Sequence, residues 1–431
     1  MVGAIIVFAL TYLLVAGRRL GVLRVSRPAA AAAGGAACVL TGVLTPEQAY
    51  ASIDGDTIVL LISMMILAAH LDHAGFFEWG AAVALRATRS PQRLLTVVVF
   101  SAGILSAFLV NDAVCFLMTP IVVRLVRRLR LGGTLFLMAL ATSANIGSVM
   151  TIIGNPQLMI IGSLSDLQFR GYCLAMAPLG LVCLAVTRLL LPRFYPLRPR
   201  VSKEARRRAE WLATPFDDAD ELPADFRRTM AHDLRPALLV KCAISLTLAL
   251  VGFFAGLNVA WTALAAAGLL LVAAGWEPRA AFRHVDWQLL LFVTGLFVVV
   301  GGLRSRGASE HMFRLLEPWF GGEASHQAWV LSSLTFLGCN LFSNIPFVLV
   351  ASEWMQQLVD PRLGWMILGM ASTFAGNLMV ISSVANVLVR DRGRAVAEIR
   401  FADHLRYGGV ITLLTTILGT FWVLGVVRPA G

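Results

Sequence analysis

The chain has 431 residues, of which 58% are hydrophobic and only 14% are charged, and its mean hydropathy is +0.76. This composition excludes an ordinary soluble protein and is typical of a chain that crosses a membrane many times. The formal net charge of +11 comes from Lys and Arg clusters between apolar stretches. It therefore reports on membrane topology and does not indicate nucleic-acid binding.

Apolar stretches long enough to cross a bilayer, which takes about 20 helical residues, recur along the chain. We expect the first to be a membrane span and not a removed signal peptide, because it has no preceding basic region or evident cleavage site. Two of the stretches exceed one crossing and are expected to be tilted or broken. The ten predicted spans are about 1–17, 28–44, 56–73, 133–165, 172–191, 236–256, 259–275, 286–303, 363–389 and 407–426, the long ones being 133–165 and 363–389.

Two further apolar stretches, 95–122 and 327–352, contain polar residues and a proline, as in LVNDAVCFLMTP and LFSNIPFVLV. Each is either one ordinary span or a re-entrant hairpin, since non-helical backbone at membrane depth must be surrounded by protein or line a wet cavity. If both are hairpins, 28 of the 36 Lys and Arg residues fall on one side of the membrane. This bias predicts that side to be cytoplasmic and the protein to lie in the inner (cytoplasmic) membrane.

The one long hydrophilic stretch, 193–235, mixes Pro with acidic and basic residues. It is too short and too charged for a catalytic domain, so we interpret it as a cytoplasmic linker. The predicted organisation is a first transmembrane repeat at 1–192, the linker at 193–235 and a second transmembrane repeat at 236–431.

The two halves match at an offset of 231–233 residues. The segment around Asn111 corresponds to that around Asn344, and TIIGN ending at Asn155 corresponds to SSVAN ending at Asn386. Five full spans plus one hairpin make an odd number of crossings, so the second half must be inverted; full spans in place of hairpins would make the halves parallel. We therefore expect an all-α polytopic membrane protein with two inverted repeats, each of about five transmembrane helices, one re-entrant hairpin and a broken helix. Such repeats are typical of secondary transporters.

Four polar clusters lie at membrane depth, two in each half. Gly154 and Pro156 are expected to interrupt a helix around Asn155, because proline removes a donor and restricts its predecessor. Unwound backbone offers carbonyls to a cation and a helix N-terminus to an anion. A single Ser or Thr is more simply explained by helix packing, but symmetric Asn clusters favour a site. The candidate binding residues are Asn111, Asp112, Thr142, Asn145, Gly154, Asn155, Pro156, Ser343, Asn344, Thr373, Asn377, Ser383 and Asn386.

Asp112 is a carboxylate well inside an apolar stretch, and no basic residue precedes Arg124 to neutralise it. Burying an ionised carboxylate is costly unless it is paired or hydrated. Asp112 therefore binds a cation, carries a proton, or stays hydrated at a hairpin tip. Sodium is the expected cation, at a first site near Asn111, Asp112 and Asn155 and a second near Asn344 and Asn386.

The paired hairpins, the tip sequences VNDAV and FSNIP, and the TIIGNPQ break with its SSVAN counterpart resemble the ion transporter superfamily. That group includes divalent-anion/sodium symporters, citrate and arsenite permeases and sodium/proton antiporters. The resemblance covers nearly the whole chain apart from the linker. It implies a homodimer in the lipid bilayer, with one part of each repeat moving against the rest to give alternating access.

In the divalent-anion symporters each hairpin tip carries a Ser-Asn-Thr signature that meets substrate carboxylates and flanks sodium. The matching positions are Val110-Asn111-Asp112 and Ser343-Asn344-Ile345, which keep both asparagines but place Asp112 where the threonine stands. A fixed negative charge repels a dianion, so the arsenite permease-like and uncharacterised anion permease branches are closer.

We therefore expect a secondary active transporter that moves a small anion (an inorganic oxyanion, an arsenite-like species or a carboxylate) with H⁺ or Na⁺ and no other cofactor. The alternative is a Na⁺/H⁺ antiporter with Asp112 as the exchanging carboxylate. Broken helices in a repeat disfavour a channel. An enzyme is not expected, because no nucleophile–base pair or metal set lies at membrane depth. The group His70, Asp72 and His73 stands at a span end, where interfacial solvation explains it.

Overall fold

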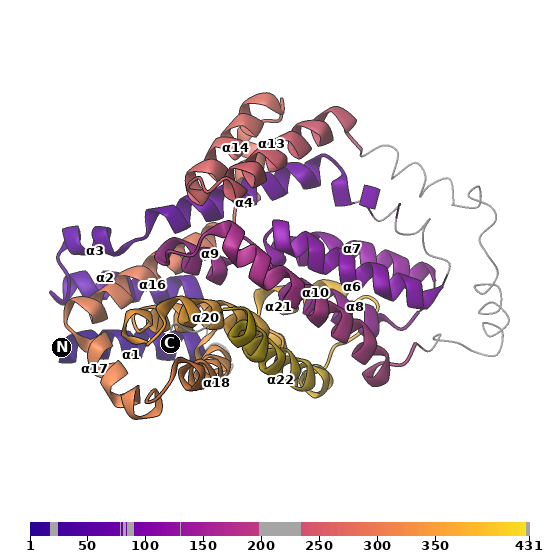
Figure 1. The fold of residues 1–431 in the computed structure, drawn as a ribbon. Coiled ribbons are helices and arrows are strands. Elements are labelled where there is room, and N and C mark those ends of the chain that lie inside the picture. Colours follow the sequence, from indigo (N-terminus) through magenta and orange to yellow (C-terminus); the bar gives the residue numbers. More distant parts are fainter. Residues whose placement is uncertain are drawn as a thin grey trace.

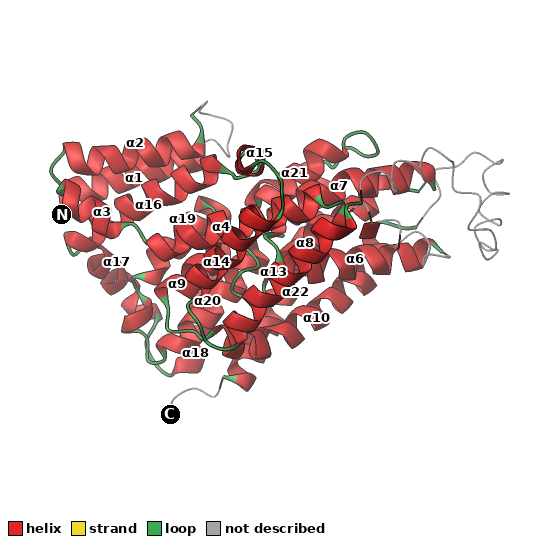
Figure 2. Ribbon diagram, turned by 90° about the horizontal axis from the view of Figure 1, so that it is seen from above, coloured by secondary structure: helices red, strands yellow, loops and turns green. Residues whose placement is uncertain are grey.

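A computed structural model describes residues 1–17, 25–77, 79–80, 83, 90–129, 131–197 and 234–427. Within these ranges every regular element is a helix (Figure 2). Most of the predicted linker 193–235 lies outside the described residues, which include only 193–197 and 234–235 of it.

The helices of the first half are α1 (Val2–Gly17), α2 (Arg27–Leu40), α3 (Pro46–Ser52), α4 (Gly55–His73), α6 (Pro91–Phe108), α7 (Asn111–Arg128), α8 (Gly133–Ser148), α9 (Pro156–Leu164) and α10 (Phe169–Phe194). Of these, α3 and α9 are short and the other described helices have 14 residues or more.

The second half repeats much of this order. Its main helices are α13 (Pro236–Phe254), α14 (Val259–Ala273), α15 (Pro278–Phe282), α16 (Trp287–Ser305), α17 (Ala308–Leu316), α18 (Ala324–Phe342), α19 (Asn344–Ser352), α20 (Pro361–Ala375), α21 (Val384–Gly393) and α22 (Phe401–Val426). The order differs at α19, which has nine residues where its counterpart α7 has 18.

Six helices of the described chain are long and apolar enough to cross a membrane: α4, α6, α10, α13, α16 and α22. The predicted spans at the two ends of the chain correspond to α1 and α22, and α1 and α14 are shorter apolar helices. Both predicted spans that exceeded one crossing are divided. Span 133–165 forms α8 and α9, and span 363–389 forms α20 and α21.

The two ambiguous stretches form helical hairpins. Leu109 and Val110 connect α6 to α7, and Ser343 alone connects α18 to α19. The members of each pair pack against one another. Helix α19 has nine residues, or about 14 Å of helix, whereas the hydrocarbon core is about 30 Å thick. Helix α19 is therefore too short to cross the membrane by itself, while the re-entrant placement of both hairpins in the membrane stays a prediction.

The same pairs of elements pack together in both halves. Helix α2 contacts α16 and α14 contacts α4, so each half packs on the other through equivalent helices. Likewise α8 contacts α6 and α10, as α20 contacts α18 and α22. Figure 1 shows α2 beside α16 at the left and α13, α14 and α4 together at the top. This pattern agrees with a repeat, while the inverted orientation of the halves stays a prediction.

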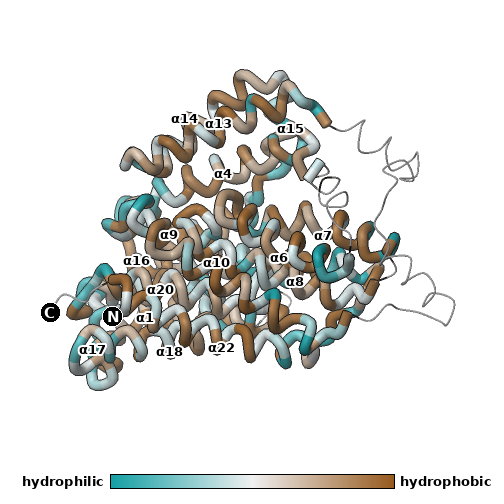
Figure 3. The backbone as a smooth tube through the Cα atoms, turned by 45° about the vertical axis from the view of Figure 1, so that its right-hand side comes forward, coloured by the Kyte–Doolittle hydropathy of each residue, from teal (hydrophilic) through white to brown (hydrophobic). Residues whose placement is uncertain are grey.

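Hydrophobic residues follow the helices through the body of the molecule, and hydrophilic residues gather toward helix ends near α17 and α7 (Figure 3). Small residues bring some helices into backbone contact. A Cβ on Gly147 of α8 would overlap the backbone of Gly103 in α6. Close approach of this kind is a main source of helix association in membranes, where lipid is as apolar as the side chains.

We expect Gly147→Ala to separate α6 from α8 and to lower stability by about 1–3 kcal/mol, the usual cost of overpacking. The measurement is the thermal unfolding midpoint in detergent. The control is Gly268→Ala in α14, because nothing lies within 4 Å of its added Cβ. Equal midpoints for the two variants would contradict this packing.

Candidate functional site

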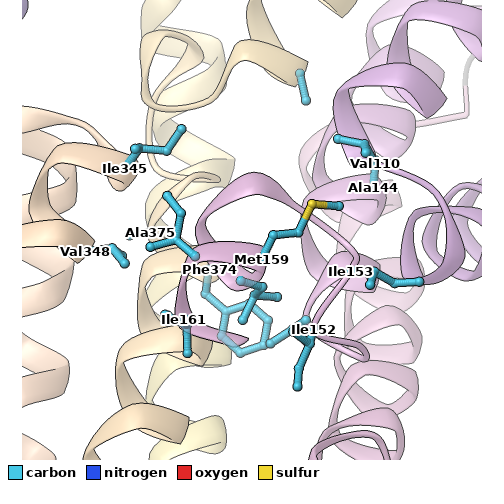
Figure 4. Close-up of a cluster of buried hydrophobic side chains, with 14 of the residues drawn as sticks. Val110, Ala144, Ile152, Ile153, Met159, Ile161, Ile345, Val348, Phe374 and Ala375 are labelled. Atoms are coloured by element: carbon cyan, nitrogen blue, oxygen red, sulfur yellow. The ribbon is translucent and has the colours of Figure 1, made fainter. Parts of the chain in front are cut away.

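The four half-helices made by the two breaks meet in the middle of the molecule. Helix α8 contacts α20 and α21, and α9 contacts α20. Each helix end leaves backbone N–H and C=O groups without helical partners, and no lipid group satisfies them. Figure 4 shows the apolar packing around this crossing, where Val110 of the first hairpin and Ile345 of the second flank Met159 and Phe374. The polar groups of the breaks must therefore be satisfied by other parts of the protein.

Asn145 of α8 is the centre of the hydrogen-bond network. Its Nδ2 donates to Asn377 Oδ1 (3.0 Å) and Asn386 Oδ1 (3.1 Å), both from the second half. Its Oδ1 accepts from Asn111 Nδ2 at the first hairpin tip (2.9 Å) and from Ser383 Oγ (3.1 Å). One buried amide thus joins a hairpin tip, its own broken helix and the broken helix of the other half.

Asn155 bridges the first break and also reaches across to the second half. Its Oδ1 accepts from the Leu158 backbone N–H (2.8 Å) and so caps α9. Its Nδ2 donates to Ser148 Oγ (2.8 Å) and to Thr373 Oγ1 of α20 (3.1 Å). An Asn at this position satisfies a helix N-terminus that lies away from water.

Gly154 fixes the first hairpin tip to the break. Its carbonyl accepts a hydrogen bond from the backbone N–H of Asn111 (3.0 Å). A Cβ at Gly154 would overlap the backbone of Ser148, so only glycine allows this closure. Movement of the hairpin tip must therefore move the break with it.

The second break has a different hydrogen-bond pattern. Asn386 Nδ2 donates to the carbonyls of Gly376 (2.8 Å) and Met379 (3.1 Å). At the hairpin tip Ser343 has a φ of 99°, in the left-handed region that favours glycine. Asn344 Oδ1 and Asn377 Nδ2 are buried and have no hydrogen-bond partner in the part of the chain that the structure describes. Such groups are costly to leave unpaired, so this acceptor and this donor are the network atoms most available to a solute.

Asp112 lies one residue beyond the first tip, against a cavity of about 390 Å³ that we call the Asp112 cavity. The backbone N–H of Ala385, in the first turn of α21, lies close enough to the Asp112 carboxylate to favour the ionised form. The N-terminus of a half-helix carries partial positive charge. Asp112 therefore occupies a helix end that the sequence suggested for an anionic solute.

The Asp112 cavity is acidic. Asp286, which caps α16, is close enough to Asp112 for their charges to repel. Asp72 also lines the cavity, and Arg283 is the guanidinium among its lining residues. The hairpin tip contributes Val110 and Ala113 to the walls as well as Asp112, and α21 contributes Val384 and Leu388.

The structure brings most of the predicted site residues together. Those joined by the contacts above are Asn111, Asn145, Gly154, Asn155, Thr373, Asn377, Ser383 and Asn386. Pro156 starts α9, Ser343 makes the tight turn, and Asn344 follows it. Thr142 hydrogen-bonds within its own helix, to the Met138 carbonyl at 2.7 Å. Whether any of these residues binds a solute or sodium stays a prediction.

Sequence reasoning missed two members of the site. Ser148 bonds Asn155 across the break, and the Nε2 of buried His404 lies 3.2 Å from the Asn377 carbonyl. His404 escaped notice because the last span was predicted to begin at residue 407, whereas α22 begins at Phe401. The sequence did contain a signal for this residue, because His404 lies within one helical turn of the predicted span 407–426.

The interpretation of His70 by interfacial solvation is wrong. The side chain is buried, and its Nδ1 donates to the Ile66 carbonyl at 2.8 Å. Trp276, in the connection from α14 to α15, covers it with an edge-on contact and stacks on His73. Tryptophan in this connection replaces the water that a free helix end would have. Among the described residues no group of three His, Cys, Asp or Glu is arranged to hold a metal ion.

The sequence model of the citrate transporter family CitMHS matches residues 12–375 of this chain. The chain belongs to the CitMHS citrate transporter family. This membership confirms the resemblance to the ion transporter superfamily.

Individual proteins give the same result. The chain is 27% identical to the transporter arsB of Dictyostelium discoideum, over 92% of this chain and 87% of that protein. It is 29% identical to the silicon efflux transporter LSI3 of Oryza sativa subsp. japonica, over 92% of both chains. The YdaH transporter of Alcanivorax borkumensis has a similar fold, with a TM-score of 0.56 over 90% of each chain at 13% identity. The protein is thus a membrane transporter.

We expect Asn145→Ala to leave four buried polar partners unsatisfied and to cost about 2–4 kcal/mol of stability. Thermal unfolding in detergent measures the loss. Ser106→Ala removes another buried polar group, but one whose hydroxyl has no partner, so we expect little change. An Asn145→Ala protein as stable as the Ser106→Ala protein would show that the network does not hold the halves together.

Proposed function

We propose that this protein is a secondary active transporter for a small oxyanion of the arsenite type or its protonated acid, driven by proton movement at Asp112. The observation that supports this most directly is the position of Asp112. It lies at the head of an acidic cavity and one residue from the Asn145 network. A carboxylate there links the protonation state of the cavity to the hairpin tip.

The chemistry of the site favours a small hydroxylated solute over a citrate-like polyanion. The network offers amide and hydroxyl groups, which donate and accept hydrogen bonds without adding charge. The cavity leading to it carries Asp72, Asp112 and Asp286. Carboxylates in a poorly hydrated space repel a di- or trianion unless cations neutralise them first. The similarity to LSI3, which is named as a silicon efflux transporter, supports the same choice.

A proton suits the coupling step better than sodium. A sodium ion at the second break would need several oxygen ligands. The carbonyls of Gly376 and Met379 already accept hydrogen bonds from Asn386, so Asn344 Oδ1 is the neutral oxygen left to bind the ion. Asp112 needs only a proton to become neutral beside Asp286, and so to relieve the repulsion between them.

The remaining parts of the proposal concern assembly and placement. Each chain contains two inverted repeats, and two chains form a homodimer in the inner (cytoplasmic) membrane. The linker 193–235 lies in the cytoplasm. The bias of Lys and Arg supports this orientation.

The test is transport by purified protein in proteoliposomes, with a pH gradient, a sodium gradient or neither. We expect arsenite or silicate flux that follows the pH gradient and does not need sodium. Citrate and a monocarboxylate serve as comparison solutes. Flux of citrate alone, or flux that follows only sodium, would refute the proposal.

Asp112→Asn separates coupling from binding. We expect gradient-driven accumulation of the oxyacid to fall at least about tenfold, a loss of about 1.4 kcal/mol of driving force, because the amide cannot carry the proton. Solute exchange at equal pH should persist, since the tip asparagines remain. Glu310→Gln removes an exposed carboxylate on α17 and is the control. Unchanged pH-driven accumulation in Asp112→Asn would rule out this role.

A Na⁺/H⁺ antiporter with Asp112 as exchanging carboxylate is the second candidate, favoured by the acidic character of the cavity. It predicts proton release on addition of sodium with no oxyacid present. Exchange of that kind, abolished in Asp112→Asn, would replace the proposal above.

A further inference from the structure

Two cavities of the molecule are built from equivalent positions of the two halves. The Asp112 cavity has a counterpart of about 230 Å³ that contains Arg304, which we call the Arg304 cavity. Eight of its thirteen lining residues, all in α4, α16 or the residues just before them, stand 232 positions from eight of the sixteen residues that line the Asp112 cavity, for example Val300 for Ala68 and Arg304 for Asp72. The two cavities are therefore equivalent openings on the two sides of the molecule.

The other walls of the two cavities are not equivalent. The Asp112 cavity is lined by Val110 at the first hairpin tip and by Val384, the first residue of α21. The Arg304 cavity is lined by Leu349, Ser352 and Glu353 at the far end of α19 and by Leu164, the last residue of α9. The Asp112 cavity thus reaches a hairpin tip and a break. The Arg304 cavity ends instead at the far ends of α19 and α9, away from the second hairpin tip and the first break.

Two polar contacts cross the Arg304 cavity. Arg304 of α16 pairs with Glu353, the residue after α19, with Nη1 and Oε1 3.5 Å apart. Ser163 of α9 donates to Asp54 Oδ1, at the start of α4, at 2.6 Å. All four residues line this cavity or adjoin its walls. Each contact joins the α4 and α16 walls to an element that carries a hairpin or a break.

The residue types of the Arg304 pair are not repeated at the Asp112 cavity, because the counterpart of Glu353 at the same offset of 232 positions is Ile121. The counterpart of Arg304 is Asp72, which has the opposite charge. Asp286, the counterpart of Asp54, accepts from the backbone N–H of Leu289 in its own helix. Glu353 has a side chain only 16% exposed. Burial raises the pKa of Glu353 and the Arg304 guanidinium lowers it, so the acid gains from keeping its partner.

We propose that the Arg304–Glu353 ion pair and the Ser163–Asp54 hydrogen bond form a latch that keeps the Arg304 cavity away from the Asn145 network while the Asp112 cavity reaches it, and that both contacts break when the transporter turns to the other side. This proposal rests on the transport function proposed above. The latch residues are positioning residues: they set which cavity reaches the Asn145 network and do not touch the solute.

The latch biases an equilibrium between two states and leaves the fold unchanged. A partly exposed ion pair and one charged hydrogen bond are modest interactions. Their loss should change the ratio of the two states by about tenfold, and not by orders of magnitude beyond that.

The test uses two matched reporters in a background where the six native cysteines, all buried, are replaced. Ala68→Cys reports on the Asp112 cavity and Val300→Cys, its repeat counterpart, on the Arg304 cavity. Each is treated with a membrane-impermeant thiol reagent from the side on which its cavity opens. The latch is broken by Ser163→Ala with Glu353→Gln, which leaves the cap that Asp54 gives to α4 intact.

We expect breaking the latch to increase the labelling rate at Val300→Cys about tenfold and to reduce the rate at Ala68→Cys. The double variant Arg304→Glu with Glu353→Arg exchanges the two charges and keeps the ion pair, so it should retain the original labelling rates. Residues with only a structural role would not respond in this way. Glu310→Gln, on the neighbouring helix α17, should change neither rate. Unchanged rates, or an equal increase at both reporters, would overturn the latch.

Oxyacid flux through the cysteine-free parent separates this outcome from failure of the proposed function. If oxyacid flux is normal and the latch variants leave the labelling rates unchanged, the latch alone is refuted. If the labelling rates shift as expected but the protein shows no oxyacid flux, the proposed substrate is refuted and the latch is retained.

Discussion

The structure depends on one constraint: a broken helix inside a bilayer must find partners for its free polar ends within the protein. Asn145 meets this constraint with one amide that bonds the first hairpin tip and both residues Asn377 and Asn386 of the opposite half. The contact is strong because no water competes for it, and it is specific because the loss of any partner leaves buried groups unpaired. The breaks, which weaken each half alone, become the junction that holds the halves together.

The two halves share this architecture but differ in charge. Asp112 follows the first tip asparagine, whereas Ile345 follows the second. The carboxylate of Asp112 also lies close to the backbone N–H of Ala385 in the N-terminal turn of α21. A neutral network with one carboxylate on one side separates two tasks: amides and hydroxyls hold a solute, and the carboxylate responds to protons. The opposite charges of Arg304 and Asp72 extend this asymmetry to the two cavities.

Much of this arrangement followed from the sequence. Length alone predicted that 133–165 and 363–389 would be tilted or broken, and the repeat predicted which asparagines would gather. Partners across the halves did not follow, because an offset of about 232 residues relates equivalent positions without saying which ones meet. Asn155 therefore pairs with Thr373 and not with its counterpart Asn386. Burial of His70 was also missed, because its cover, Trp276, comes from the other half.

The central claim is that two inverted halves each insert a hairpin from opposite sides of the membrane. Single cysteines at Gln92 and Arg128, which flank the first hairpin, and at Gly321 and Arg362, which flank the second, test it in intact cells with a membrane-impermeant thiol reagent. The account predicts that both members of a pair are labelled from the same side and that the two pairs are labelled from opposite sides. Labelling of the two members of either pair from opposite sides would show a full span and contradict it.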